Sequence, residues 1–257
     1  MRQNKILSAT SLLLAFVIIC LCSSVSFAQE CSVVNLIPDF NCDKYVQVTV
    51  LGDSLVYGFG DTKNSNKGGY VLRAQKKFPD LTLTNVGVQG LNSQQLLNNV
   101  QDAFDSDVET SRLLNTIVSS DVVILDLGRN DKWLYGAGDT NGVSDTFKRL
   151  QSIADTIRTK TKLLTGKSIL VVTSVLYLPN RGAQGPFVKE LNKYIAKSNT
   201  ASKPADLNFS GVSKRLIGTD QIHPTSKGYD ALAKVFIKYL KTRLVAHIKD
   251  QRSCTCE

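Results

Sequence analysis

Short apolar runs alternate with segments of helical periodicity along most of the chain. The runs at 46–51, 81–85, 122–127 and 169–175 read as strands, and 205–209 is a weaker fifth run. Those at 122–127 and 169–175 are almost continuously apolar, which is typical of strands covered on both faces. The pattern therefore predicts a sheet whose third and fourth strands are buried from both sides.

Apolar residues recur at helical spacing between these runs. Three helices are predicted, the first capped by Ser144, the second opened by Pro186 and the third following Pro224. Their apolar stripes consist of Phe147, Leu150, Ile153, Ile157 and Leu164; of Val188, Leu191 and Ile195; and of Tyr229, Leu232, Phe236, Leu240 and Leu244. Strands that alternate with helices pair in parallel through right-handed crossovers. We therefore expect an α/β protein, a three-layer α/β/α sandwich with a mostly parallel five-stranded sheet.

The first 28 residues have the order of a secretory signal peptide. Arg2 and Lys5 precede an apolar run at 11–22, and small or polar residues follow up to Ala28. The run is shorter than the roughly 20 residues that a membrane-spanning helix needs, and an uncleaved anchor is the alternative. We therefore expect 1–28 to be removed and 29–257 to form a single domain that is secreted or periplasmic.

Composition and charge narrow this picture only slightly. The 257 residues are 42% hydrophobic and 21% charged, which excludes a disordered tail protein or a collagen-like repeat. The formal net charge of +9 comes from scattered basic residues. Since no basic patch with interleaved aromatic residues is present, we expect no nucleic-acid partner. The charge suits solubility or a peripheral contact with a membrane or an anionic cell envelope.

Four cysteines remain outside the signal peptide, close to the two ends of the expected domain. They are Cys31, Cys42, Cys254 and Cys256. Four cysteines allow three pairings, but a bridge between the last two would close a very tight ring. We therefore expect two disulfides that join the two ends, with their pairing left open. A zinc site is the alternative, although this spacing is a poor zinc pattern.

Motifs of polar residues and glycine follow the predicted strands, where parallel α/β sheets bind their ligands. The sequence GDSL at 52–55 follows the first strand, and NVGVQG at 85–90 ends the second. GRND at 128–131 follows the third strand, and DQIH at 220–223 precedes the final helix. A hydroxyl, an amide and an imidazole with a nearby carboxylate are therefore expected at one end of the sheet.

These four motifs, in this order, resemble those of the GDSL, or SGNH, hydrolase family. The resemblance implies a flavodoxin-like fold and a serine esterase or lipase without a metal or organic cofactor. It implies that Ser54 is the nucleophile, that His223 is the general base and then the acid, and that Asp220 orients the imidazole. The oxyanion hole would consist of the N–H groups of Ser54 and Gly90 and the side-chain amide of Asn130.

The sequence departs from the family pattern in two of the motifs. Leu91 and Asn92 follow Gly90, where Asp and then Thr or Ser are frequent. Arg129 stands inside the third motif, where a small or neutral side chain is frequent. We expect Arg129 to form a surface salt bridge, with contact to an acidic substrate as the alternative.

Other residues near the motifs carry weaker expectations. Asp53 and Asp131 are expected to form structural hydrogen bonds instead of taking part in the chemistry. Five residues either line the acyl or alcohol side of the pocket or simply pack: Trp133, Tyr135, Tyr177, Leu178 and Pro179.

The sequence therefore predicts an exported serine hydrolase that cleaves carboxylic esters through an acyl-serine intermediate. We expect acetyl or other short acyl groups on a small-molecule, polysaccharide or lipid substrate. The resemblance leaves open a lysophospholipase or thioesterase. An O-acyltransferase would use the same residues with a sugar hydroxyl as acceptor, and a non-catalytic binding module would usually lack one of them.

Overall fold

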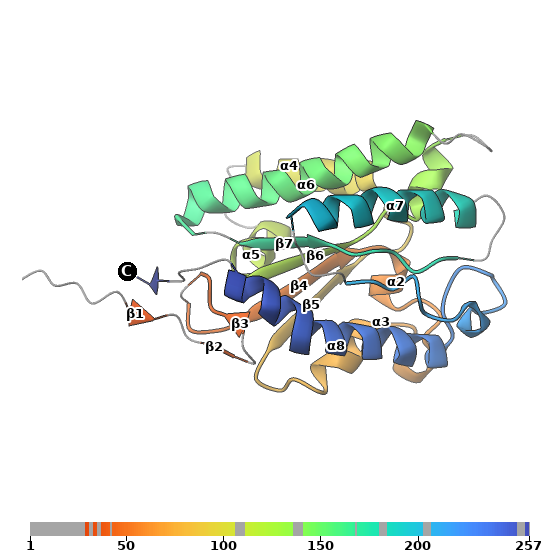
Figure 1. Cartoon of the computed structure of the whole chain (residues 1–257), viewed down its shortest axis with the longest axis horizontal. Helices are drawn as coiled ribbons and strands as arrows, with labels where there is room; N and C mark the ends of the chain where they lie inside the picture. Colours follow the sequence, from red (N-terminus) through yellow and green to blue (C-terminus); the bar gives the residue numbers. More distant parts are fainter. Residues whose placement is uncertain are drawn as a thin grey trace, which may run out of the picture. The chain divides into compact units, whose positions relative to one another are not determined.

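Figure 1 shows the computed structural model of the whole chain. It describes residues 29–30, 33–34, 37–41, 43–105, 111–135, 141–167, 169–179, 184–202, 207–250 and 255–256. The expected signal peptide lies outside these residues, as do Cys31, Cys42 and Cys254, so both the signal and the disulfides remain predictions. No helix within the described ranges is both long enough and apolar enough to cross a bilayer.

The chain forms two compact units, which are described separately. The smaller unit comprises Met1–Glu30 and Thr255–Glu257, and the larger one is Cys31–Cys254. In the smaller unit, β1 (Gln29–Glu30) pairs antiparallel with β8 (Thr255–Cys256). The larger unit begins with a short antiparallel pair and contains the main sheet. The pair consists of β2 (Val33–Val34) and β3 (Ile37–Pro38).

A parallel sheet of four strands forms the centre of the larger unit (Figure 1). The strands are β4 (Gln47–Gly52), β5 (Thr82–Gly87), β6 (Val122–Asp126) and β7 (Leu170–Thr173). Their order across the sheet is β5-β4-β6-β7, and each neighbouring pair is parallel. The predicted α/β fold class is therefore confirmed, and each of these four strands lies within two residues of its predicted bounds.

The expected fifth strand is reduced to a single bridge. Val175, just after β7, pairs in parallel with Asn208. The Val175 N–H donates to the Leu207 carbonyl at 2.8 Å, and its own carbonyl accepts the Phe209 N–H at 2.9 Å. The chain then turns, because the Val212 N–H donates back to the Phe209 carbonyl at 3.1 Å, and the pairing stops. The order is that of a flavodoxin-like sheet with a minimal last strand.

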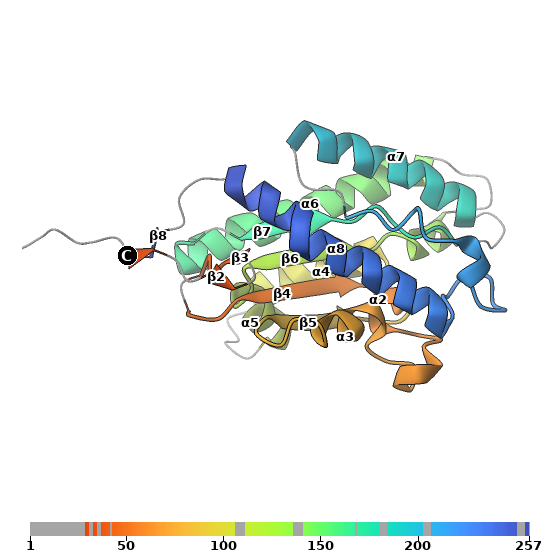
Figure 2. The same ribbon diagram turned by 60° about the horizontal axis from the view of Figure 1, so that its bottom comes forward.

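Helices cover both faces of the sheet (Figures 1 and 2). One face is covered by α3 (Gly69–Gln75) and α8 (Ser226–Asp250). The other face is covered by α4 (Ser93–Asp105), α5 (Arg112–Val118), α6 (Asn141–Thr165) and α7 (Gln184–Ser202). Single turns of helix, α2 (Ser54–Tyr57), η1 (Thr62–Asn64), η2 (Asn130–Leu134) and η3 (Lys214–Leu216), lie in the connecting loops.

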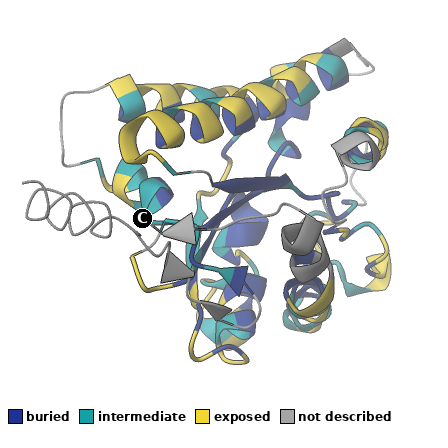
Figure 3. Cartoon of the chain, turned by 60° about the vertical axis from the view of Figure 1, so that its left-hand side comes forward, coloured by how far each residue is buried: buried dark blue, intermediate teal, exposed yellow. Residues whose placement is uncertain are grey.

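The strands contribute alternate side chains to the two apolar layers. Along β6, Val122 and Ile124 belong to the cluster under α3 and α8, whereas Val123 and Leu125 belong to the cluster under α4 to α7. This alternation follows from the two-residue period of a strand. Figure 3 shows the result, with buried strands in the centre and exposed residues on the outer sides of the helices. Burial on both faces explains why the sequence of β6 is continuously apolar.

The three predicted helices exist, with starts that differ from the prediction. The helix α6 begins three residues before Ser144, and α7 begins two residues before Pro186, which lies in its first turn where a missing N–H costs little. The helix α8 begins two residues after Pro224. Leu164 was expected on the apolar stripe of α6 but is 60% exposed. The buried side of this helix extends only as far as Thr161, one turn before Leu164.

Candidate active site

Ser54 is held on a tight turn at the carboxyl end of β4. It is the first residue of α2, and the Asp53 carboxylate caps this helix by accepting the Leu55 N–H at 3.0 Å. A side chain at Gly52 would collide with the carbonyl of Asp126 on the neighbouring strand, so the turn requires glycine there. Ser54 is 7% exposed.

Ser54, His223 and Asp220 form a continuous chain of hydrogen bonds. The Ser54 Oγ lies 2.8 Å from His223 Nε2, and His223 Nδ1 lies 2.6 Å from Asp220 Oδ2. The other carboxylate oxygen, Asp220 Oδ1, accepts the N–H groups of Ile222 and His223, both at 2.9 Å. Because the carboxylate is anchored by the backbone, it fixes the orientation of the imidazole.

These hydrogen bonds also determine the charge of Asp220. Burial raises the pKa of its carboxyl group, but the hydrogen bonds from Ile222 and from the His223 ring and backbone outweigh burial and lower the pKa below its ordinary value. A carboxylate next to Nδ1 favours the tautomer with the proton on that nitrogen. Nε2 is then free to accept the proton of the Ser54 hydroxyl.

Phe59 is a site residue that the sequence analysis missed. Its ring lies against the His223 imidazole, with centroids 4.7 Å apart and planes tilted by 56°. The Phe59 N–H donates to the Ser54 carbonyl at 2.9 Å, and the Phe59 carbonyl accepts the Tyr229 hydroxyl at 2.6 Å. No motif or spacing in the sequence points to this residue, because its partners come from α2 and α8.

The second and third motifs lie beside each other at the same end of the sheet. Gly52 pairs with Gly87 on β5 and with Asp126 on β6, so the three strands end level. The Asn130 side-chain amide donates to the Leu91 carbonyl at 3.0 Å, next to Gly90 in its left-handed turn (φ 75°). An amide has two N–H hydrogens, so this bond leaves a second donor for a substrate oxygen.

The departure at Leu91 and Asn92 has a structural explanation. The Asn92 side chain accepts the Gln95 N–H at 2.9 Å, and the Gln95 side chain accepts the Asn92 N–H at 3.1 Å. This reciprocal pair is a capping box at the start of α4. Leu91 is 6% exposed and packs in the core, so these two residues serve the fold beside Gly90.

Asp53 and Asp131 have the structural hydrogen bonds that the sequence analysis expected. Asp131 accepts the Ser93 N–H at 2.9 Å and a guanidinium N–H of Arg149 at 3.1 Å, which ties the Asn130 loop to α4 and α6. The surface salt bridge expected for Arg129 is wrong. Arg129 is 2% exposed and pairs with two buried aspartates beneath the site. A substrate cannot reach its guanidinium.

The aromatic residues near the motifs differ in their exposure and in their hydrogen-bond partners. Tyr177 is buried and donates its hydroxyl to the Ser213 carbonyl at 3.3 Å, so it belongs to the core. The Tyr135 hydroxyl accepts a hydrogen bond from Arg149 at 2.8 Å. Trp133, three residues after Asn130, is 62% exposed.

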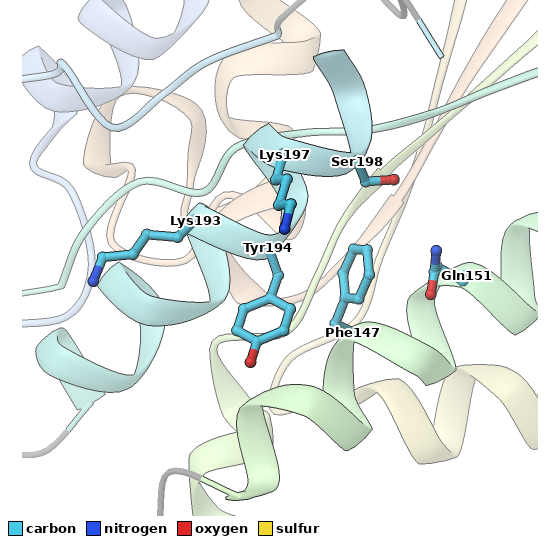
Figure 4. A pocket seen from close by; sticks show the side chains of 6 residues that line it. All are labelled: Phe147, Gln151, Lys193, Tyr194, Lys197 and Ser198. Carbon is cyan, nitrogen blue, oxygen red and sulfur yellow. The ribbon is translucent and has the colours of Figure 1, made fainter. Parts of the chain in front are cut away.

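The structure contains a small cavity beside the histidine and a larger groove elsewhere. The cavity has a volume of about 280 Å³, and its lining includes Asp220, His223, Gly60, Thr62 and Ser226. The groove, of about 600 Å³, lies between α6 and α7. It is lined by Phe147, Gln151, Lys193, Tyr194, Lys197 and Ser198 (Figure 4). This lining lacks an acid–base pair, so the groove has no chemistry comparable to that of the Ser54 site. Among the residues whose positions are described, no cluster suited to a metal ion occurs.

The fold and the site together define a class of protein. The site has the arrangement of a serine hydrolase: a hydroxyl, an imidazole and a carboxylate form one hydrogen-bonded chain at the carboxyl end of a parallel sheet. The chain belongs to the GDSL-like lipase/acylhydrolase family, whose model matches residues 50–231. It is thus an enzyme of the GDSL hydrolase type, as the sequence analysis predicted.

Solved structures of low sequence identity share the fold. A lipase/acylhydrolase from Enterococcus faecalis is 15% identical with a TM-score of 0.57, covering 77% of this chain and 96% of its own. A psychrotrophic esterase from Pseudoalteromonas sp. is 18% identical with a TM-score of 0.56, covering 76% and 96%. An acetyl xylan esterase is 16% identical with a TM-score of 0.57, covering 75% and 98%. A search of curated proteins finds no significant match.

Proposed function

We propose that this protein is an exported carboxylic-ester hydrolase in which Ser54 is the nucleophile. The observation that carries the proposal is the hydrogen-bonded chain from Ser54 Oγ through the His223 ring to the Asp220 carboxylate. A serine hydroxyl is a weak nucleophile until a base takes its proton. Here the base lies within hydrogen-bond distance and its far nitrogen is held by an ionised acid.

The reaction proceeds in two acyl-transfer steps. Ser54 Oγ attacks the ester carbonyl carbon while its proton passes to His223 Nε2, and a tetrahedral intermediate forms. When the intermediate collapses, the carbon–oxygen bond to the alcohol breaks and His223 returns the proton to the departing oxygen. A water molecule then attacks the acyl-Ser54 ester, with His223 as its base, and releases the carboxylic acid and the free serine.

Negative charge on the former carbonyl oxygen requires donors that are already in place. We assign this role to the N–H groups of Ser54 and Gly90 and to the second N–H of the Asn130 amide. Each such donor typically contributes about 2.7–4 kcal/mol to the lowering of the barrier. The bond from Asn130 to the Leu91 carbonyl supports the assignment, because it holds the amide beside the Gly90 turn.

We place the substrate among esters of acetyl or other short acyl groups, including those carried by carbohydrates. One structure of similar fold is an acetyl xylan esterase. A lipid ester or thioester is the second candidate, favoured by the exposed Trp133 and Leu134 directly after the Asn130 motif.

Export is the part of the proposal that rests on the chain ends. The charged, apolar and small residues of 1–28 support a cleaved signal peptide, and four cysteines near the ends of 29–257 suit an oxidising compartment. We propose a secreted or periplasmic enzyme that makes at most a peripheral contact with the membrane or the cell envelope.

The test is an ester panel with purified protein. Among p-nitrophenyl esters from C2 to C16, we expect the short ones to be hydrolysed fastest. Acetylated xylan and lysophosphatidylcholine are tested in the same panel. Ser54→Ala should lower kcat at least about 10³-fold, since it removes the nucleophile. Ser152→Ala, on the exposed side of α6, is the matched control and should retain full activity. Undiminished turnover in Ser54→Ala would contradict the proposal.

A further inference from the structure

Arg129 connects the two motifs that the proposed reaction needs at a fixed distance. It directly precedes Asn130, and its side chain runs inward beneath the site with 2% of its surface exposed. One guanidinium nitrogen lies 3.2 Å from Asp53 Oδ2, and the other terminal nitrogen lies 2.6 Å from Asp126 Oδ1. Two backbone carbonyls, of Asp126 at 3.3 Å and Tyr177 at 3.4 Å, accept further N–H groups.

The contact with Asp53 links Arg129 to the helix turn that carries the nucleophile. Asp53 precedes Ser54, and its two carboxylate oxygens have different partners: Oδ1 caps α2 through the Leu55 N–H at 3.0 Å, and Oδ2 faces Arg129. The helix turn that carries Ser54 and the loop that carries Asn130 are thus joined through one carboxylate. These residues are 76 positions apart in the chain.

The sheet alone does not set this distance. The parallel ladder between β4 and β6 ends at the pair Gly52–Asp126, before either motif residue. Arg129 extends the connection past that pair, and the Gln184 side chain holds its backbone carbonyl at 3.0 Å. The planar guanidinium reaches two carboxylates at once, which a lysine ammonium cannot do in the same geometry.

Arg129 also favours the ionised form of Asp53. Asp126 accepts hydrogen bonds from the Tyr70 hydroxyl at 2.8 Å and the Ser174 hydroxyl at 3.0 Å, so it is fixed independently of Arg129. Burial raises the pKa of Asp53, and the guanidinium acts against that rise. Arg129 is therefore anchored by Asp126, which other side chains hold in place, and Arg129 in turn holds the carboxylate of Asp53.

We propose that Arg129 is a positioning residue that sets the separation of the Ser54 hydroxyl and the Asn130 amide, and thereby aligns the oxyanion donor with the attacking oxygen. The proposal rests on the proposed function of Ser54 and Asn130. It assigns to an arginine, at a position where this family often has a small or neutral residue, a role that substrate contact cannot explain because the side chain is buried.

The first test is Arg129→Lys, which keeps the charge and removes the planar fork. The kcat per active serine, counted by stoichiometric organophosphate labelling, should fall about 10- to 100-fold, the range expected for a displacement of about 1 Å. KM should change by less than about threefold, because ground-state binding is not involved. Arg158→Lys on α6, whose side chain pairs with Asp155 and with the Val171 carbonyl of β7, is the matched control and should leave kcat unchanged.

A double mutant separates positioning from general destabilisation. In an Asn130→Ala background the donor is already lost, so Arg129→Lys should lower kcat by less than about threefold.

Hydrogen exchange of the full chain gives a readout that does not depend on turnover. In Arg129→Lys, residues 52–60 and 126–134 should exchange at least about fivefold faster, while residues 146–160 of α6 stay unchanged. Unchanged exchange in the two motif segments, an unchanged kcat, or an equal loss of activity in the Asn130→Ala background would overturn the proposal. If the proposed function failed, the wild-type protein would cleave no ester, although exchange in the two motif segments would still be faster in Arg129→Lys.

Discussion

The two ends of the sheet bury similar polar groups and use them differently. At the amino end, the Asp121 carboxylate accepts N–H groups of Phe40 at 2.5 Å, Asn41 at 3.2 Å and Gln47 at 2.8 Å. Each bond satisfies a backbone donor of the segment that leads into β4. At the carboxyl end, the side chain of Ser54 has the His223 ring as its partner. Polar groups at the amino end are committed to the backbone, whereas those at the carboxyl end keep capacity for a substrate.

The pKa values of two aspartates differ accordingly, Asp121 at the amino end of the sheet and Asp220 at the carboxyl end. Burial raises the pKa of Asp121 to about 7, because its backbone donors do not fully replace water and Asp39 adds negative charge nearby. Asp220 is less buried, and its hydrogen bonds lower its pKa below the ordinary value. The comparison shows that the same residue type has a lowered pKa where it faces the imidazole and a raised pKa where it is buried against backbone N–H groups.

The largest effect is expected from Asp220→Asn. An amide facing Nδ1 would donate to it and move the ring proton to Nε2, which could then no longer accept the serine proton. The kcat should fall about 10⁴-fold, as in other enzymes with this arrangement, with an unchanged melting temperature. Steady-state kinetics and thermal unfolding check both parts. The control is Asp155→Asn on the exposed side of α6, and a loss below tenfold in Asp220→Asn would contradict the assignment.

A smaller effect is expected from Asn130→Ala at the same end of the sheet. Loss of one oxyanion donor should lower kcat about 10²- to 10³-fold, with KM nearly unchanged, because the donor acts on charge that develops in the transition state. Asn98→Ala, on the exposed side of α4, serves as control. If KM rose while kcat stayed constant, Asn130 would bind the ground state and the assignment would be wrong.

The smallest effect concerns the amino end and appears in stability instead of catalysis. The pKa of Asp121 is about 7 in the fold and lies near 3.9 in an unfolded chain, so between these values the native state binds the additional proton. Its contribution to stability is therefore complete below about pH 4 and is lost as the pH rises towards about 7. Urea unfolding should give a free energy of unfolding about 2 kcal/mol lower at pH 8 than at pH 5 from this group.

Asp121→Asn provides the comparison, because its side chain does not titrate. The variant should lose most of this decrease between pH 5 and pH 8, while kcat per active serine at pH 7 stays close to the wild-type value. An equal pH dependence in both proteins would show that Asp121 is not the group responsible.

The candidate site was largely predictable because its chemistry lies at the ends of strands. Runs of β-branched and apolar residues predicted β4, β5, β6 and β7, and parallel strands bring their carboxyl ends to one side of the sheet. GDSL and GRND therefore had to converge if the alternation of strands and helices was correct. DQIH precedes the final helix instead of following a strand, so its place at the site was expected from the resemblance alone. The structure brings Ser54, His223 and Asp220 into contact.

The departures have causes that a single segment does not contain. The fifth strand ends after one bridge because the chain turns at Phe209. Phe59 reaches the imidazole because α2 and α8 hold its backbone between them. Arg129 looks like a surface residue in a polar motif, and its burial depends on an aspartate 76 positions away.

The sequence by itself determined the order of strands and helices and the turn at Ser54, because periodicity, capping and glycine conformations act over a few residues. The candidate reacting groups followed from the resemblance of the four motifs to those of the GDSL hydrolase family. Only the tertiary structure decided which charged side chains are buried, which is why Arg129 moved from the expected surface to a place beneath the site. A buried charge is stable only beside compensating charges and hydrogen bonds, and here those partners come from strands and loops far apart in the chain.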